Sequence, residues 1–143
     1  MDVEIGYDEW SAGMSETEKI TINLGLVDLG QIDLLVQEGF YSNRTDFIRT
    51  AIRNQLTTHA EEVKQTVARK TLVLGLEHYT RRDLESVREA DETLEIKVLG
   101  LASIDEDVDP DLARETISSL VVLGALRASP AVKSALKDRI QSS

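Results

Sequence analysis

The sequence predicts an α+β fold in two parts. Residues 19–24 alternate polar and apolar side chains, which is the period of a half-buried strand, and two stretches with helical spacing of apolar residues follow. In the second half, three short apolar runs that contain Val-Leu-Gly are each followed by a helix-like segment. We therefore expect a strand and two helices over residues 18–58, and a small α/β module with three strand-helix repeats over residues 70–143.

Composition excludes several classes of protein. The chain has 143 residues with 41% hydrophobic content, which is enough for a folded core, and a formal net charge of −10. It contains no cysteine, so a disulfide scaffold, a zinc finger and a cysteine nucleophile are excluded. No apolar run is long enough to cross a bilayer, and the N-terminus lacks the basic start of a signal peptide. The expectation is a cytoplasmic protein with no membrane partner.

The negative charge is concentrated at the N-terminus. Residues 1–18 hold six acidic residues and no basic one, residues 19–59 are neutral, and residues 60–143 carry −4. A short acidic segment with glycine and serine buries little surface, so residues 1–17 are expected to form a flexible acidic arm. The functional alternative is an arm that competes with phosphate for a nearby basic surface.

The expected strand has two different faces. Its apolar face carries Ile20, Ile22 and Leu24. Its polar face carries Lys19, Thr21 and Asn23. A cation, a hydroxyl and a carboxamide can all hydrogen-bond base edges or phosphates. A lone strand is unstable, and no other β-patterned run follows before residue 71, which leaves the same strand of another subunit as a partner.

Two helices are expected after the strand. The first covers about residues 28–38, with Asp28 as its cap, and Gly39 ends it. Its apolar stripe consists of Leu29, Ile32, Leu35 and Val36. The second helix starts at Asn43, with Asp46 in capping-box position. Its first turn presents backbone N–H groups that could hold a phosphate.

These features together resemble the ribbon-helix-helix family of CopG/Arc/MetJ-type transcriptional regulators. The matching segments are Lys19-Ile-Thr-Ile-Asn-Leu24, Gly39-Phe-Tyr and Ser42-Asn-Arg-Thr-Asp-Phe-Ile-Arg49, in this order. The resemblance covers about residues 18–58 and implies an intertwined homodimer whose paired strands enter the major groove of double-stranded DNA.

The resemblance also implies roles for individual residues. The base-reading side chains would be Lys19, Thr21 and Asn23, with lysine where the family often has arginine, which makes reading at that position less strict. The phosphate-binding residues would be Ser42, Asn43, Arg44 and Thr45. The dimer core would consist of Ile20, Ile22, Leu24, Ile32, Leu35, Phe47, Ile48 and Ile52.

The second half contains a candidate internal repeat. After a helical linker at residues 59–69, the Val-Leu-Gly motif places glycines at Gly75, Gly100 and Gly124. Alternating strands and helices imply parallel strands with helical crossovers. The main rival is one continuous helix over residues 110–128, and a chance match of so short a motif is the other. Residues 70–143 are interpreted as an assembly or sensing domain, through which dimers could form a tetramer or a larger assembly.

No metal, cofactor or catalytic site is expected. The two histidines, His59 and His78, are interpreted as ordinary surface or packing residues. The acidic run 105–111 resembles a calcium loop but has Pro110 where that loop needs glycine, so it is interpreted as a turn and helix cap. The basic pairs Arg69-Lys70 and Arg81-Arg82 could touch DNA backbone but are typical of solvated surface.

Three functions remain open. The first is a sequence-specific DNA-binding transcriptional regulator, which is not an enzyme. The second is an antitoxin, although antitoxin tails are typically disordered when free and residues 70–140 have the composition of a folded segment. The third is a scaffold that uses the ribbon only to dimerise, which the net charge of −10 favours.

Overall fold

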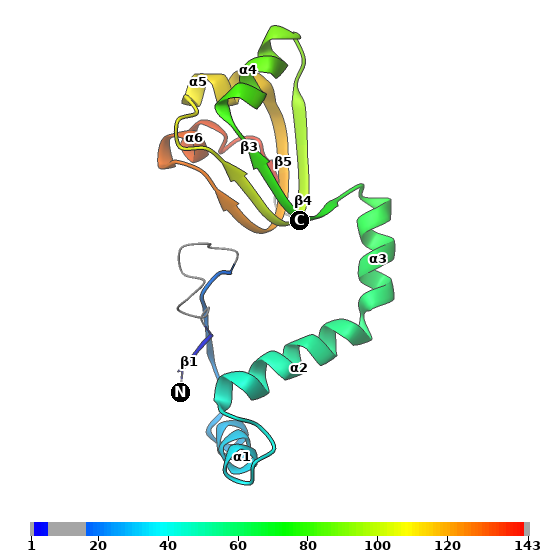
Figure 1. The fold of residues 1–143 in the computed structure, drawn as a ribbon, viewed down its shortest axis with the longest axis vertical. Helices are drawn as coiled ribbons and strands as arrows, with labels where there is room; N and C mark the ends of the chain where they lie inside the picture. The colour runs from blue at the N-terminus through cyan, green and yellow to red at the C-terminus, as the bar shows by residue number, and fades with distance from the viewer. Residues whose placement is uncertain (1, 6–16, 142–143) are drawn as a thin grey trace. The chain divides into compact units, whose positions relative to one another are not determined.

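The structure is a computed structural model that describes residues 2–5 and 17–141 (Figure 1). The chain divides into two compact units, residues 1–63 and 64–143, and each is described by itself. The fold is mixed α+β, and its described part has six helices and a four-stranded parallel sheet.

The N-terminal unit consists of a strand pair and two helices. Strand β1 (Asp2–Ile5) pairs antiparallel with β2 (Ile20–Asn23), and Val3 lies opposite Ile22 in the register. Helix α1 (Leu26–Gln37) and helix α2 (Arg44–Thr58) follow. The expected order of one strand and two helices over residues 18–58 is therefore present.

The strand β1 corrects one expectation. A flexible arm was expected over residues 1–17, but Asp2–Ile5 is a strand, while residues 6–16 lie outside the described residues. The physical reason is visible in the sequence, because Asp2-Val3-Glu4-Ile5 alternates polar and apolar residues just as β2 does. In the prediction, the acidic composition of this segment outweighed an alternation of only four residues. Strand β2, which was expected to pair with another subunit, therefore has a partner strand within its own chain.

Both helix starts differ in detail from expectation. Helix α1 begins at Leu26 with Gly25 as its N-cap, so Asp28 lies in the first turn and does not cap it. Helix α2 is capped by Asn43, whose side chain accepts a hydrogen bond from the Asp46 N–H at 2.8 Å. The Asp46 carboxylate accepts from the Ser42 N–H at 2.9 Å, one residue earlier than a regular capping box requires.

The C-terminal unit is built on a parallel sheet in which helices cross between the strands. Helix α3 (Ala60–Arg69) leads into it. The sheet has the order β3 (Val73–Tyr79), β4 (Leu94–Ile104), β5 (Ile117–Arg127) and β6 (Ile140–Gln141). The crossover helices are α4 (Arg81–Glu89), α5 (Pro110–Thr116) and α6 (Pro130–Ala135).

The rival of one helix over residues 110–128 is wrong, because α5 ends at Thr116 and β5 begins at Ile117. The β-branched residues Val121 and Val122 favour the strand here, since they lose rotamer freedom in a helix. Asp109 and Ser129 cap α5 and α6, each followed by proline at the first helical position.

One face of this sheet carries the core of the unit. Alternate residues of β4, among them Ile96, Val98 and Ala102, are fully or almost fully buried. They belong to one cluster with Leu84 of α4, Leu112 and Ala113 of α5, and Val132 of α6. The three crossover helices therefore cover the same face, and Figure 1 shows them gathered on one side of the strands.

Three glycines lie side by side across the sheet. The register places Gly75 of β3 opposite Gly100 of β4, and Gly100 opposite Gly124 of β5. All three have positive φ angles, 130°, 141° and 120°, which favour glycine. A Cβ atom on Gly100 would overlap the carbonyl oxygen of Gly75, and one on Gly124 would overlap that of Gly100. A Cβ atom on Gly75 would meet nothing within 4 Å.

The contrast between Gly75 and Gly100 gives a test of the close strand approach. Gly75→Ala should cost about 1–3 kcal/mol through its strained φ alone. Gly100→Ala adds the overlap with the Gly75 carbonyl and should cost about 1–3 kcal/mol more, as overpacking does. Urea unfolding followed by far-UV circular dichroism measures both variants. Equal losses for the two would show that the strands do not approach as closely as described.

Candidate nucleic-acid interface

The polar residues predicted to read bases lie at β2. Thr21 and Asn23 belong to the strand, Lys19 directly precedes it, and all three are exposed. Alternation along the strand puts the three on one face, which combines one positive charge with donor and acceptor groups. This surface can hydrogen-bond base edges or phosphate oxygens.

The opposite face of β2 is also uncovered. Ile20 is 51% exposed and Ile22 is 36% exposed, although both are apolar. Only Leu24, after the end of the strand, packs partly against the small core of Leu29 and Ile48. A strand of two exposed faces cannot be held by its own side chains, so its stability depends on what pairs with its edges. In this structure, β1 occupies one of the two edges.

The predicted dimer-core residues divide into two groups. Ile32 and Ile48 are buried, and Leu24, Leu35 and Phe47 are half-buried. Ile20, Ile22 and Ile52 are exposed. The structure adds apolar residues that the helical stripe did not include and that are at least 55% exposed: Leu26, Val27, Leu34, Phe40 and Leu56. The described part of the N-terminal unit therefore presents much apolar surface around a very small core.

The predicted phosphate-binding residues gather at the start of α2. Ser42, Asn43 and Arg44 are exposed, and Thr45 is half-buried. The Asn43 cap already binds the N–H of Asp46, and the Asp46 carboxylate brings a negative charge into the same turn. Helix N-termini attract anions through their N–H groups and dipole, but this carboxylate reduces the local positive potential.

Arg44 makes a contact that the sequence analysis did not predict. Its Nε and Nη2 atoms donate two parallel hydrogen bonds, each 2.8 Å long, to the carboxylate of Asp33 on α1. This fork joins the two helices, and Tyr41 supports the same turn by an edge-on contact with Phe47 at 5.0 Å between ring centroids. The hydrogen bonds from Arg44 lower the pKa of Asp33, and those to Asp33 raise the pKa of Arg44.

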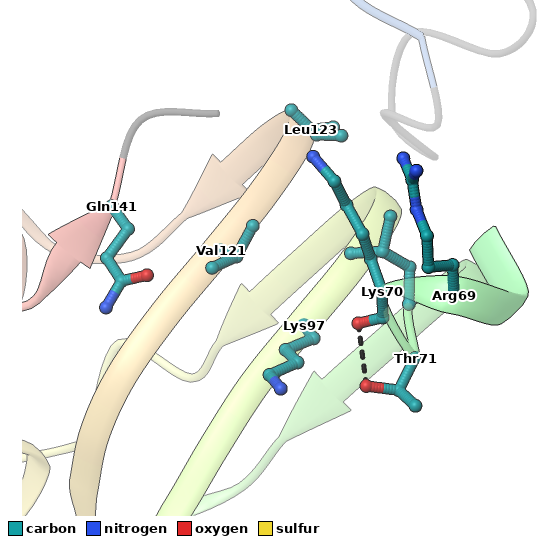
Figure 2. Close-up of a pocket in the computed structure, with 8 residues that line it drawn as sticks. Arg69, Lys70, Thr71, Lys97, Val121, Leu123 and Gln141 are labelled. Carbon is teal, nitrogen blue, oxygen red and sulfur yellow. Dashed lines mark hydrogen bonds between the residues drawn. The ribbon is translucent and has the colours of Figure 1, made fainter. Parts of the chain in front are cut away.

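A second polar site lies in the C-terminal unit. A groove of about 480 Å³ lies beside β4, β5 and the end of α3, and Figure 2 shows the residues that line it. Its lining residues are Arg69, Lys70, Thr71, Leu72, Lys97, Val121, Leu123 and Gln141. Three of these are cationic and none is acidic, although Lys97 also lies 3.8 Å from the carboxylate of Glu95. The Arg69-Lys70 pair thus lies in a groove that is compatible with an anion.

Among the described residues, no group of three or more His, Asp or Glu side chains is placed to hold a metal ion. The acidic run contains the α5 cap Asp109, and the Nε2 atom of His78 lies 2.8 Å from a carboxylate oxygen of Asp105. Within residues 2–5 and 17–141, no helix has the length and apolar character needed to span a bilayer.

Comparison with known proteins identifies relatives of this chain. The sequence profile of the Ribbon-Helix-Helix transcriptional regulator family matches residues 15–133, which includes the strand, both following helices and most of the C-terminal unit. An uncharacterized protein of Methanocaldococcus jannaschii is 39% identical over 49 residues, or 34% of this chain. The chain spans about half the length of that relative, 50%. No solved structure matches the chain.

The fork between Arg44 and Asp33 gives a prediction for pH. Arg44→Gln should raise the pKa of Asp33 back towards its usual value, because the charge-assisted hydrogen bonds that lower it are lost. A lowered folded-state pKa stabilises the fold above the usual carboxyl pKa, and this contribution disappears as the pH falls through the lowered value. The unfolding free energies of wild type and variant should therefore converge in acid. Carboxyl carbon NMR titration measures the pKa directly, and Arg53→Gln serves as the control on the same helix.

An unchanged Asp33 pKa in Arg44→Gln, or an equal change in Arg53→Gln, would contradict this assignment of the ion pair.

Proposed function

This chain belongs to the Ribbon-Helix-Helix transcriptional regulator family, and from this membership we propose that it is a sequence-specific DNA-binding regulator that acts as a homodimer. The observation that carries the proposal is the pair of faces of β2. One face presents Lys19, Thr21 and Asn23 to solvent, while the other exposes Ile20 and Ile22. A DNA-binding ribbon needs a polar face that contacts the bases and an apolar face that is buried against the rest of the dimer.

The dimer is supported by the exposed apolar surface of the N-terminal unit. Exposed apolar groups on α1 and α2, such as Leu34 and Ile52, lie in the same unit as the uncovered strand face. A second chain that packs against these helices removes this surface from water, at about 25 cal/mol per Å² of apolar area. In the proposed dimer the partner's β2 pairs with the edge of β2 that β1 leaves open.

DNA contact in this proposal divides between two parts of the unit. The β2 side chains read base edges in the major groove, where asparagine pairs well with adenine and lysine with guanine. The start of α2, with Ser42 and Asn43 exposed, positions the phosphate backbone. Arg44 belongs to the same turn, but its guanidinium already donates hydrogen bonds to both carboxylate oxygens of Asp33. It can therefore bind a phosphate only if it shares its donors between the two anions or leaves the Asp33 carboxylate.

The acidic charge shapes how such a protein binds. A chain of net charge −10 gains little from non-specific attraction to phosphates, because that attraction depends on released counterions at basic contacts. Its affinity must come to a larger extent from base contacts and from the use of two ribbon strands at once. A steep loss of affinity with rising salt still distinguishes a DNA-binding protein from a scaffold that uses the ribbon only to dimerise.

The double variant Thr21→Ala/Asn23→Ala tests the reading face. It should leave the dimer intact and remove the preference for the specific site over random DNA, with a loss of roughly 1–3 kcal/mol for each base contact. Gel-shift titration against DNA from the protein's own promoter region measures this preference. The matched control Asn54→Ala/Thr57→Ala removes the same side-chain types from the exposed end of α2 and should bind as wild type.

Unchanged affinity and preference in the β2 variant would overturn the assignment of the reading face. The absence of any salt-sensitive DNA binding by the wild-type chain would overturn the proposed function itself and favour the scaffold.

A further inference from the structure

The parallel sheet of the C-terminal unit has two unpaired edges in the described part of the chain. Strand β3 pairs with β4 on one side, and its other side has no partner from Val73 to Tyr79. At the opposite end, the described part of β6 pairs with β5 at Leu120 and Val121, and no described strand pairs on that side with residues 122–126, the free part of β5. Edges of this kind present free N–H and C=O groups that can pair with another strand.

The exposed edge of β3 lacks the usual protection against pairing. Its sequence contains no lysine, arginine or proline, and Glu77 is its only acidic residue. Leu74 and Leu76 are 67% and 57% exposed. An edge with this composition favours coverage by another strand over permanent exposure to water.

The register of the sheet indicates which strand would fit. Neighbouring strands place like residues at one level: Leu74 beside Leu99, and Leu99 beside Leu123. The glycines follow the same order, and each interior glycine leaves room for the carbonyl oxygen of the glycine before it. Gly75 has the same positive φ and the same open side, but no strand precedes it. A strand that carries a matched glycine would complete this row, and β5 of another copy carries one.

We propose that the C-terminal unit binds a second copy of this chain head to tail, so that β3 of one copy extends the sheet beside the free part of β5 of the other. The strands run parallel and keep the register of the sheet, with Gly75 beside the partner copy's Gly124 and Leu74 beside its Leu123. The contact is thus the same one that β3 and β4, and β4 and β5, make within one chain.

The ends of the two strands are compatible with this contact. The chain enters β3 through a turn, in which Thr71 has a φ of 53° and the Leu72 N–H bonds to the Val67 carbonyl. The backbone before Val73 therefore departs from the strand direction. In β6, Gln141 is the last described residue and lies opposite Val121, directly before the free part of β5. The two segments thus take consecutive stretches along β5.

In the proposed contact, β6 of one copy and β3 of the next lie end to end beside β5, and together they have the sequence pattern of β4 and β5. Ile140-Gln141 of one copy followed by Val73-Leu-Gly-Leu76 of the next gives Ile-Gln-Val-Leu-Gly-Leu. The corresponding segment of β4 is Ile96-Lys-Val-Leu-Gly-Leu101, and that of β5 is Leu120-Val-Val-Leu-Gly-Ala125. Two copies together therefore form a row that neither chain forms alone. An antiparallel contact between two β3 edges would not align these levels.

The contact joins two different surfaces, so it does not close by itself as a two-fold dimer does. Combined with a ribbon dimer in the N-terminal unit, it would link dimers into rings or rows. Such an assembly would place several ribbons on one DNA molecule, where avidity compensates for the acidic charge. The contact between C-terminal units does not depend on DNA binding and can be tested without DNA.

Cysteine cross-linking tests the register, because the natural chain has no cysteine. Leu74→Cys and Leu123→Cys are made as two separate full-length variants, then mixed and mildly oxidised. Within one chain these positions are two strands apart, roughly 10 Å, but in the proposed contact they are neighbours at roughly 5 Å, within disulfide reach. We expect a disulfide-linked dimer in the mixture and none in either variant alone. As the matched control, Leu99→Cys lies at the same level on β4, which has strands on both sides, and should not cross-link with Leu74→Cys.

A single chain that carries both Leu74→Cys and Leu123→Cys should form a ladder of covalent multimers. Cross-linking of Leu74→Cys with itself to the same extent as in the mixture would overturn the head-to-tail contact in favour of a two-fold one. The absence of cross-links in both the mixture and the double variant, with circular dichroism showing that the variants fold, would overturn the contact altogether.

Discussion

In the proposed dimer, the N-terminal unit depends on burying apolar surface that the described residues of one chain leave exposed. The described part of this unit has a core of little more than Leu29, Ile32 and Ile48, while Ile52 and both isoleucines of β2 remain exposed. So small a core offsets little of the conformational entropy that a unit of this size loses on folding. In this proposal, β2 has an apolar face that the dimer would bury and a polar face that would contact DNA, so assembly and recognition would depend on one element.

The C-terminal unit, in contrast, buries its apolar side chains within one chain. Three crossover helices cover one face of a parallel sheet, and residues such as Leu84, Val98 and Leu120 are fully buried without a second chain. The close approach of the strands depends on glycine at Gly100 and Gly124, where any side chain would overlap the neighbouring backbone. What this unit leaves unsatisfied is backbone pairing at its edges, whereas the N-terminal unit leaves apolar side chains uncovered.

The sequence allowed the order of most elements to be predicted, but neither β1 nor β6, because strand and helix periods differ clearly only in longer segments such as those around Ile20 and Phe47. It did not predict β1, because composition outweighed a period of only four residues. The Arg44–Asp33 fork could not be predicted from spacing, since the two residues lie on different helices whose packing the sequence alone does not give. The Val-Leu-Gly spacing suggested parallel strands, but the positive φ of Gly75 required coordinates.

We propose that a second chain completes the N-terminal unit. The concentration dependence of unfolding tests it most directly, because a fold that requires association becomes more stable as protein concentration rises. The experiment uses the full-length chain, and hydrogen exchange of the β2 and α2 amides reports the thermal unfolding of residues 17–63. The unfolding temperature should rise across a hundredfold increase in protein concentration. Sedimentation should show no folded species at the 15.9 kDa mass of one chain. A folded monomer whose β2 amides are protected equally at every concentration would contradict the account.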